Sequence, residues 1–406
     1  AERGAPTVVA RGAGLVAPRI REVAVVFFGL GLTSFGGPVA HLGYFREAFV
    51  VRRKWLSESD YADLVALCQF LPGPASSQVG MAIGHQRAGL PGALAAWIAF
   101  TLPSVLLLYA VALGADRWQG PLAQGALHGL KLAALAVVAQ AVWLMARRLT
   151  PNWPRRVIAA VAAAAILIAP FSAMPAIVIG AAVALGAALD RSPAGRANTA
   201  TDRSHPIAFA ALALFLVLLV AWPLLAAATH LSWIDIADRF YRTGALVFGG
   251  GHVVLPLLQN ELLTPGLINR DIFLAGYGAA QAVPGPLFSF AFYAGLMLNP
   301  PTNGVVGGLL ALTAIYLPSF LLVLGALPYW TRWKALPRLR AALDAANAAV
   351  VGVLFAELCT PVFTNAVFGA ADLAVATIAL AALTVRAPPW LVVIACGAAG
   401  LGLARL

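Results

Sequence analysis

Thirteen apolar stretches, each near the length that crosses a bilayer as a helix, constrain this chain more than any other feature. A membrane helix needs about 20 mostly apolar residues. Soluble domains carry about 25% charged residues, whereas this chain has 11%. We therefore expect an all-α polytopic membrane protein. The predicted segments are 22–43, 62–84, 90–115, 121–146, 155–170, 173–189, 207–229, 238–259, 272–298, 304–329, 341–360, 367–385 and 389–405.

Four motifs occur twice, in the same order and at nearly the same spacing. The copies lie 213, 212, 215 and 213 residues apart, which indicates a duplicated unit. The pairs are Phe35-Gly36-Gly37 with Phe248-Gly249-Gly250, Gln69 to Pro74 with Gln281 to Pro286, Leu102-Pro103-Ser104 with Leu317-Pro318-Ser319, and Leu130 to Val138 with Leu343 to Val351.

The only long hydrophilic stretch separates the two copies. We expect an N-terminal repeat at 1–189, a polar cytoplasmic linker at 190–206, and a C-terminal repeat at 207–406 with an extra leading helix at 207–229. Equivalent segments are seven positions apart in the series of predicted helices. Because an odd number reverses the direction of crossing, the two homologous repeats should be inverted.

The distribution of basic residues predicts how the chain is oriented in the membrane, and one loop does not fit that orientation. With a cytoplasmic N-terminus, most of the 27 Lys and Arg residues lie on the cytoplasmic side, as the positive-inside rule requires. The loop 46–54 opposes that rule if segment 22–43 crosses the membrane. In the alternative, 22–43 enters and leaves on the same side around its break, which moves Arg147 and Arg155 outside. We favour the full crossing.

Glycine and proline interrupt the first and eighth segments at matching places. The interruptions, Gly36-Gly37-Pro38 and Gly249-Gly250-Gly251, weaken a continuous helix. They indicate either close helix packing through small residues or broken helices whose backbone lines a cavity. Paired interruptions favour the second interpretation, and they place Gly36, Gly37, Gly249 and Gly250 at a binding site. His41 and His252 lie beside the breaks and could donate to an anion or carry a proton.

The Pro-Gly-Pro motifs give a sharper prediction. A half-helix that begins after the motif would present free N–H groups and a positive dipole end to an anion. The alternative is a purely structural hinge. The second copy has Phe288 and Phe290 where the first has serine and glutamine, so the half-sites should differ chemically. The candidate residues at the two motifs are Gly73, Ser76, Ser77, Gln78, Gly285 and Ser289.

Charged residues within or beside the segments are further candidates. Lys131 shares a helical face with Gln124 and His128, and Asp344 lies on the counterpart helix. Ionisable groups at this depth indicate function by default, although a structural pair of Asp344 with Lys131 or Arg340 is an alternative. The loop cations either concentrate anions at a cavity mouth or anchor to lipid headgroups. These cations are Arg52, Arg53 and Lys54.

Several functions are excluded on composition and motifs. The net charge of +11 lies in short loops, so we expect no nucleic-acid partner. The three cysteines form no CxxC or Cys/His pattern, and we expect no metal and no cofactor. The sequence contains no GxxxxGK[ST] motif, which argues against ATP-driven transport by this chain. We find no convincing nucleophile and base set, so the chain is not expected to be an enzyme.

Together these motifs resemble the chromate ion transporter family. In the first half the resemblance rests on Phe35 to Pro38 with His41, Arg52 to Leu56, Leu71 to Pro74 with Ser77 and Gln78, and Gly84. The second half, with Phe248 to His252 and Val283 to Pro286, is similar to the C-terminal domain of two-domain members.

The resemblance implies a multi-pass inner-membrane protein that exports chromate, a tetrahedral oxyanion, and confers chromate resistance. Alternatives are a sulfate or other oxyanion carrier, a passive anion channel and, more remotely, a membrane-embedded enzyme. Besides the oxyanion and the lipid bilayer, candidate partners are a proton or other counter-ion and a second copy of the chain.

Overall fold

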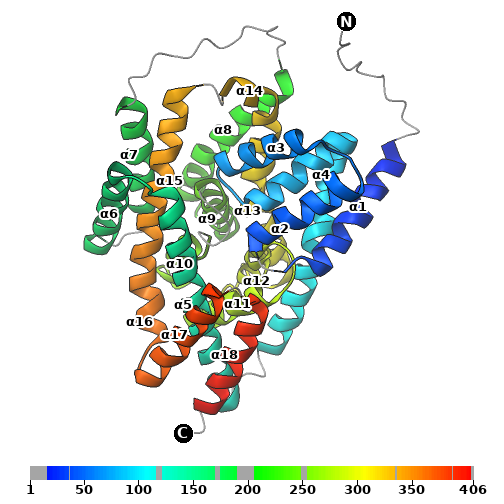
Figure 1. Ribbon diagram of the computed structural model, residues 1–406. Coiled ribbons are helices and arrows are strands. Elements are labelled where there is room, and N and C mark those ends of the chain that lie inside the picture. Colours follow the sequence, from blue (N-terminus) through cyan, green and yellow to red (C-terminus); the bar gives the residue numbers. More distant parts are fainter. Residues whose placement is uncertain are drawn as a thin grey trace, which may run out of the picture.

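The computed structural model describes residues 16–35, 37–115, 121–169, 174–189, 205–247, 254–333, 336–385 and 387–403 (Figure 1). Every regular element in these ranges is helical, as expected for an all-α membrane protein. The first repeat contains α1 (Val16–Thr33), α2 (Gly37–Arg46), η2 (Glu47–Arg52), α3 (Glu58–Phe70), α4 (Ala75–Ala115), α5 (Pro121–Leu149), α6 (Trp153–Ile168) and α7 (Met174–Leu189). The linker 190–204 lies outside the described residues.

The second half begins with α8 (Pro206–Thr229) and then follows the order of the first. Its breaks and short helices match those of the first half closely. These elements are α9 (Ser232–Leu246), α10 (Val254–Leu263), α11 (Arg270–Ala282), η4 (Leu287–Ser289), α12 (Phe290–Leu296), α13 (Gly304–Ala326), η5 (Leu327–Tyr329), α14 (Trp330–Trp333), α15 (Pro337–Glu357), η6 (Leu358–Phe363), α16 (Thr364–Ala366), α17 (Ala370–Thr384) and α18 (Pro389–Leu403).

Long apolar helices give the chain the surface of a membrane protein. Five helical stretches in the described ranges are long and apolar enough to cross a bilayer. Pro206–Thr229 is the most apolar of them, and only 11% of its most apolar stretch is buried, so most of α8 presents leucine, valine and phenylalanine outward. Such a surface requires lipid around it.

The two repeats are interleaved rather than set side by side. Helix α15 of the second repeat packs on α6 and α7, while α17 and α18 pack on α5 (Figure 1). Each repeat therefore buries its apolar faces largely against the other, and the junction lies inside the bundle.

Helices break where the sequence predicted interruptions. Segment 22–43 is split between α1, which ends at Thr33, and α2, which begins at Gly37. Segment 62–84 is split at Pro72-Gly73-Pro74, and segment 272–298 is split at the matching motif. The broken-helix interpretation is confirmed at these places. The break between α9 and α10 falls at 248–253, outside the described residues.

The predicted full crossing of segment 22–43 is wrong. Arg53, beyond η2, lines the same hollow as Arg21 and Glu22 in the first turns of α1, so the chain returns to the end where α1 begins. The alternative that we disfavoured describes the structure. That alternative was expected to move Arg147 to the outer side of the membrane, but it does not, because α3 and the first part of α4 form a second hairpin. Arg87 of α4 pairs with Glu22 of α1 at 2.8 Å, so this hairpin also returns to the end where α1 begins.

Neighbouring contacts show that the repeats are inverted. Helix α12 follows α4 in the same direction, since Gly285 lies against Ser104 and Phe292 contacts the ring of Tyr109 further along. The chain then reverses, and Gly307 near the start of α13 packs on Gly295 of α12. Helix α13 is thus antiparallel to α4, its equivalent in the first repeat.

Candidate functional site

The two Pro-Gly-Pro motifs are held by a reciprocal pair of backbone hydrogen bonds. Gly73 N–H donates to the Val247 carbonyl at 2.6 Å, and Gly285 N–H donates to the Ser34 carbonyl at 2.9 Å. Ser34 and Val247 are equivalent residues, because they differ by the repeat offset of 213. Each motif is therefore fixed by the end of the broken helix in the other repeat.

Both central glycines are required by backbone geometry. Gly73 has φ +124° and Gly285 has φ +99°, in the region that L-residues avoid. A Cβ on Gly73 would lie 2.5 Å from Ser319 Oγ, and one on Gly285 would lie 3.2 Å from Ser104 Oγ. These serines belong to the duplicated Leu-Pro-Ser motif, so this motif and the Pro-Gly-Pro motif of both repeats meet at this junction.

Polar side chains gather around the first turn of α4. His41 contacts Ser76 Oγ through Nδ1 at 3.3 Å and the Ser34 carbonyl through Nε2 at 3.2 Å. Its ring also meets Phe100 edge-on, which fixes its plane. His41 therefore connects the first broken helix to the half-helix that follows Pro74.

The next two residues of α4 reach into the second repeat. Ser77 Oγ lies 3.4 Å from the hydroxyl of Tyr316, and Gln78 Nε2 donates to the Pro72 carbonyl at 2.6 Å and approaches Ser319 Oγ at 3.5 Å. The first-turn N–H groups of a helix have no acceptor within that helix. Hydroxyl groups from both repeats therefore lie beside the first-turn N–H groups of α4.

This region is buried and carries spare hydrogen-bonding capacity. His41, Ser76, Ser77 and Gln78 are all at most 4% exposed. Gln78 Oε1 and the hydroxyl of Ser34 are buried without a hydrogen-bond partner among the described residues. None of the Lys and Arg side chains whose exposure the structure describes is buried to this degree. We term the set Ser34, His41, Ser76, Ser77 and Gln78 the polar half-site.

The equivalent place in the second repeat is filled by rings. Phe288 and Phe290 are buried, and Phe288 packs on Tyr316 with ring centres 5.7 Å apart. The Ser289 hydroxyl donates to the Pro286 carbonyl at 2.7 Å, so its proton is already engaged. The predicted chemical difference between the half-sites is confirmed, and we term this one the aromatic half-site.

Of the remaining predicted residues near the breaks, the structure describes only one. Gly37 is the first residue of α2 and has φ +75°. Gly36, Gly249, Gly250 and His252 lie outside the described residues. In the described ranges no cluster of three or more His, Cys, Asp or Glu side chains could hold a metal ion.

The alternative in which Lys131 pairs with Asp344 is not what the structure shows. Lys131 Nζ lies 2.6 Å from Asp271 at the start of α11, while Asp344 pairs with Arg155 of α6. Both pairs join the two repeats, away from the polar half-site. Spacing could identify the charged residues but could not choose among partners on helices whose packing was unknown.

The loop cations differ from one another. Arg52 pairs with Glu47 at 2.9 Å, whereas Arg53 faces the hollow beside α1. Lys54 has φ +51° at the turn that follows. At the foot of this loop Arg46 donates to Glu58, and that hydrogen bond lowers the pKa of the exposed Glu58 carboxyl.

Sequence reasoning missed Ser34, Tyr316, Ser319 and Ser104 as members of this junction. The serines of Leu-Pro-Ser belonged to a motif whose repetition was recognised, so a signal for them existed. Ser34 lies next to a recognised motif. Tyr316 is a buried aromatic residue in a long apolar helix, and no local pattern distinguishes it from a packing residue.

Two inverted helical repeats, joined at broken helices near the middle of the bundle, define a class of polytopic membrane proteins that includes many transporters. The chain belongs to the chromate transporter family: the family model for chromate transporters matches residues 21–188 and again 234–401.

Relatives match over most of the chain. A chromate transport protein of Cupriavidus metallidurans is 26% identical over 86% of this chain and 84% of its own length. A chromate transport protein of Pseudomonas aeruginosa is 26% identical over 81% of this chain and 77% of its own. An uncharacterized transporter of Methanocaldococcus jannaschii is 24% identical over 78% of both chains. No solved structure matches this chain.

Proposed function

We propose that this protein is a secondary transporter of the inner membrane that exports chromate from the cytoplasm and so confers chromate resistance. The polar half-site is the observation that carries this proposal. Chromate is a tetrahedral dianion, and it needs several convergent hydrogen-bond donors at membrane depth. The first turn of α4, Ser34 and the two hydroxyls at Ser76 and Ser77 supply donors of that kind.

Neutral donors suit a transporter because the anion must also leave. A buried lysine or arginine would bind a dianion strongly and retain it, since opposite charges attract far more in a low-dielectric interior. Hydroxyl and N–H groups bind more weakly and exchange readily with water. We expect the domain boundaries 1–189, 190–206 and 207–406 to describe two repeats that move against each other around this site.

The residues outside the polar half-site have supporting roles in this proposal. Gly73 and Gly285 let the backbones of the two repeats touch, and Ser289 closes the aromatic half-site. Gly36, Gly37, Gly249, Gly250 and His252 would shape the two breaks. Lys131 and Asp344 hold the repeats together through Asp271 and Arg155.

The test is chromate flux in sealed inside-out vesicles with imposed pH and voltage gradients. A coupled exporter accumulates chromate inside these vesicles above its electrochemical equilibrium, and the gradient that drives this identifies the counter-ion. Flux that only follows the chromate gradient would mark a passive channel. Accumulation of sulfate but not chromate would make the protein a sulfate carrier and would contradict the proposal.

A further inference from the structure

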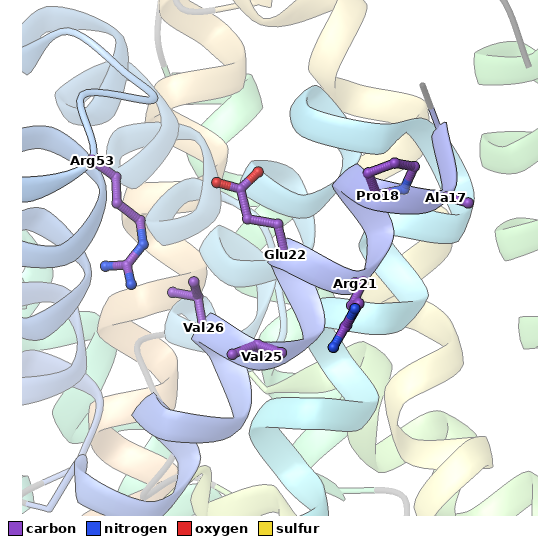
Figure 2. A pocket seen from close by; sticks show the side chains of 7 residues that line it. All are labelled: Ala17, Pro18, Arg21, Glu22, Val25, Val26 and Arg53. Atoms are coloured by element: carbon purple, nitrogen blue, oxygen red, sulfur yellow. The ribbon is translucent and has the colours of Figure 1, made fainter. Parts of the chain in front are cut away.

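A hollow lies along α1 in the first repeat. Its outer part, of about 730 Å³, is open and is lined by Arg21, Glu22 and Arg53. Figure 2 shows Arg53, from the segment after η2, facing Glu22 and Val26 of α1. A second hollow of about 310 Å³ shares Val25, Val26 and Arg53 with the first and continues inward. We term the two together the α1–η2 groove.

The inner end of the α1–η2 groove lies close to the polar half-site. Thr33, the last residue of α1, lines it. The next residue is Ser34, whose carbonyl accepts from Gly285 N–H and contacts His41. His41 in turn contacts Ser76 in the first turn of α4. The groove thus runs along α1 from exposed arginines at its mouth to Thr33, the residue before Ser34 of the polar half-site.

The mouth of the groove carries unneutralised positive charge. Glu22 is paired with Arg87 at 2.8 Å, and Glu47 is paired with Arg52 at 2.9 Å. Arg21 and Arg53 have no ion-pair partner within the described ranges. Two guanidinium groups are therefore left at the mouth, and Arg is the side chain best suited to bind tetrahedral oxyanions.

The second repeat has charged side chains where the first has the groove. Adding the offset of 213 to four groove residues, Val25, Val26, Gly29 and Ala48, gives Asp238, Arg239, Arg242 and Glu261. Three small or branched apolar positions and one glycine in the first repeat thus correspond to four ionised positions in the second.

These four side chains fill the space between α9 and α10. Arg242 lies 2.8 Å from Asp238 and 3.2 Å from Glu261, and Arg239 lies 3.3 Å from Glu261. Their side chains are only 4% to 27% exposed. The interface that corresponds to the open groove is closed by a buried ionic cluster, which we term the α9–α10 cluster.

We propose that the α1–η2 groove is a staging site for the oxyanion, with Arg21 and Arg53 binding it at the mouth, and that the α9–α10 cluster closes the equivalent path in the other repeat. This inference rests on the proposed function. The ligand is a tetrahedral dianion; a lipid phosphate shares part of this chemistry and could occupy the same arginines. Because the repeats are inverted, one path opens at each end of the bundle, and this structure has the N-terminal end open.

Filling the groove is the first test. A Cβ on Gly29 meets no atom within 4 Å, so Gly29→Leu should fit without a clash and place its side chain in the groove. Gly180→Leu on α7 is a matched control, because that glycine is also helical and also faces open space. We expect Gly29→Leu to lower chromate flux at least about tenfold with normal membrane insertion, and Gly180→Leu to transport at the parental rate.

Removing the mouth charges is the second test. Contacts between exposed charges contribute little binding free energy. The double variant Arg21→Gln with Arg53→Gln should therefore raise the KM for chromate about fivefold and leave kcat within about twofold of the parental value. Arg147→Gln, at an exposed arginine that stacks on Trp143, is the control. The kinetics are measured in vesicles of phosphatidylcholine alone and with added phosphatidylglycerol.

The outcomes separate the inference from the proposed function. If the parental protein moves chromate but both variants match it, the staging site is wrong and the proposed function stands. An unchanged KM with an effect only in the anionic vesicles would assign the arginines to lipid phosphate and overturn the inference. Loss of flux from Gly180→Leu as well would also contradict it. No chromate flux by the parental protein would instead overturn the proposed function.

Discussion

The two Pro-Gly-Pro motifs share their backbone contacts and differ in nearly everything around them. In the first repeat, serine and glutamine side chains with unused hydrogen-bonding capacity surround the motif. In the second, Phe288 and Phe290 pack against tyrosine rings. The comparison teaches that duplication preserved the backbone joint between the repeats, while the side chains around it diverged: polar in the first repeat and aromatic in the second.

The two repeats also differ at the helix pairs that precede the Pro-Gly-Pro motifs. In the first repeat an open groove runs along α1 to Thr33, next to Ser34 of the polar half-site, whereas the matching helices of the second repeat are joined by the α9–α10 cluster. Inverted repeats with identical side chains would have equivalent paths at the two ends of the bundle. A difference in side chains at equivalent positions allows one end to be open while the other is closed.

The largest effect should come from breaking the shared joint. In Gly73→Val even the added Cβ would lie only 2.5 Å from Gln78 Nε2, and the branched side chain would add further clashes. The φ of +124° at this position also costs an L-residue about 1–2 kcal/mol. We expect transport to be abolished and the melting temperature to fall. Gly285→Val, with its nearest contact at 3.2 Å, should be milder. Equal melting temperatures for the two variants would show that the joints are equally tight.

The α9–α10 cluster should be the next most sensitive. Glu261 contacts both Arg239 and Arg242, so Glu261→Gln leaves two partly buried guanidinium groups short of a partner. Arg239 keeps Asp235 and Arg242 keeps Asp238, each at 2.8 Å, so we expect a cost of about 1.5–3 kcal/mol from the lost charge-assisted hydrogen bonds. Glu22→Gln, at a half-exposed pair in the first repeat, is the matched variant and should cost far less. Thermal unfolding in detergent measures both, and similar losses would remove the distinction between the two interfaces.

Hydroxyl deletion should give a smaller change that distinguishes the half-sites. Ser77→Ala removes one donor near Tyr316, and a typical hydrogen bond contributes about 0.5–1.5 kcal/mol, so the KM for chromate should rise about fivefold. Ser289→Ala removes a hydroxyl whose proton is bound to the Pro286 carbonyl, and its KM should stay at the parental value. The initial rate of chromate uptake into inside-out vesicles measures both variants.

The smallest effect is expected at Lys131. Its partner Asp271 is 61% exposed, so Lys131→Gln leaves a carboxylate that water can solvate, at a cost of less than about 1 kcal/mol. Asp271→Asn should cost more, because Lys131 itself is only 12% exposed. Unfolding of both variants by denaturant tests this order. Loss of chromate binding by a well-folded Lys131→Gln protein would give this residue a direct role in transport.

The sequence allowed the helices, the repeat and most of the polar half-site to be predicted. Each expected apolar segment contains a described helix, because apolar stretches of this length form helices in a bilayer, but segments 22–43 and 62–84 turn back instead of crossing. Duplication made the breaks at Gly37 and Gly73 recognisable. Hydropathy is a local signal and the repeated motifs recur at a fixed offset, so both can be recognised in the sequence without knowing how the helices pack.

The rest depended on contacts between distant segments. The predicted crossing of residues 22–43 was wrong because a half-length helix pair and one full crossing have similar hydropathy. The hollow that Arg53 shares with the start of α1 distinguishes them. The partners of Lys131 and Asp344 were wrong because several opposite charges lay at comparable depth. Phe288 and Phe290 indicated that the half-sites differ, but not that aromatic rings fill the second one.

Equilibrium binding of radiolabelled chromate to the purified protein tests the central claim most directly, because it separates binding at the polar half-site from transport. The double variant Ser76→Ala with Ser77→Ala should bind chromate roughly 5- to 30-fold more weakly, from the loss of two hydrogen bonds of about 1 kcal/mol each. Ser289→Ala should bind with the parental affinity. Parental affinity in the double variant, or an equal loss in Ser289→Ala, would contradict the assignment of the oxyanion to the first repeat.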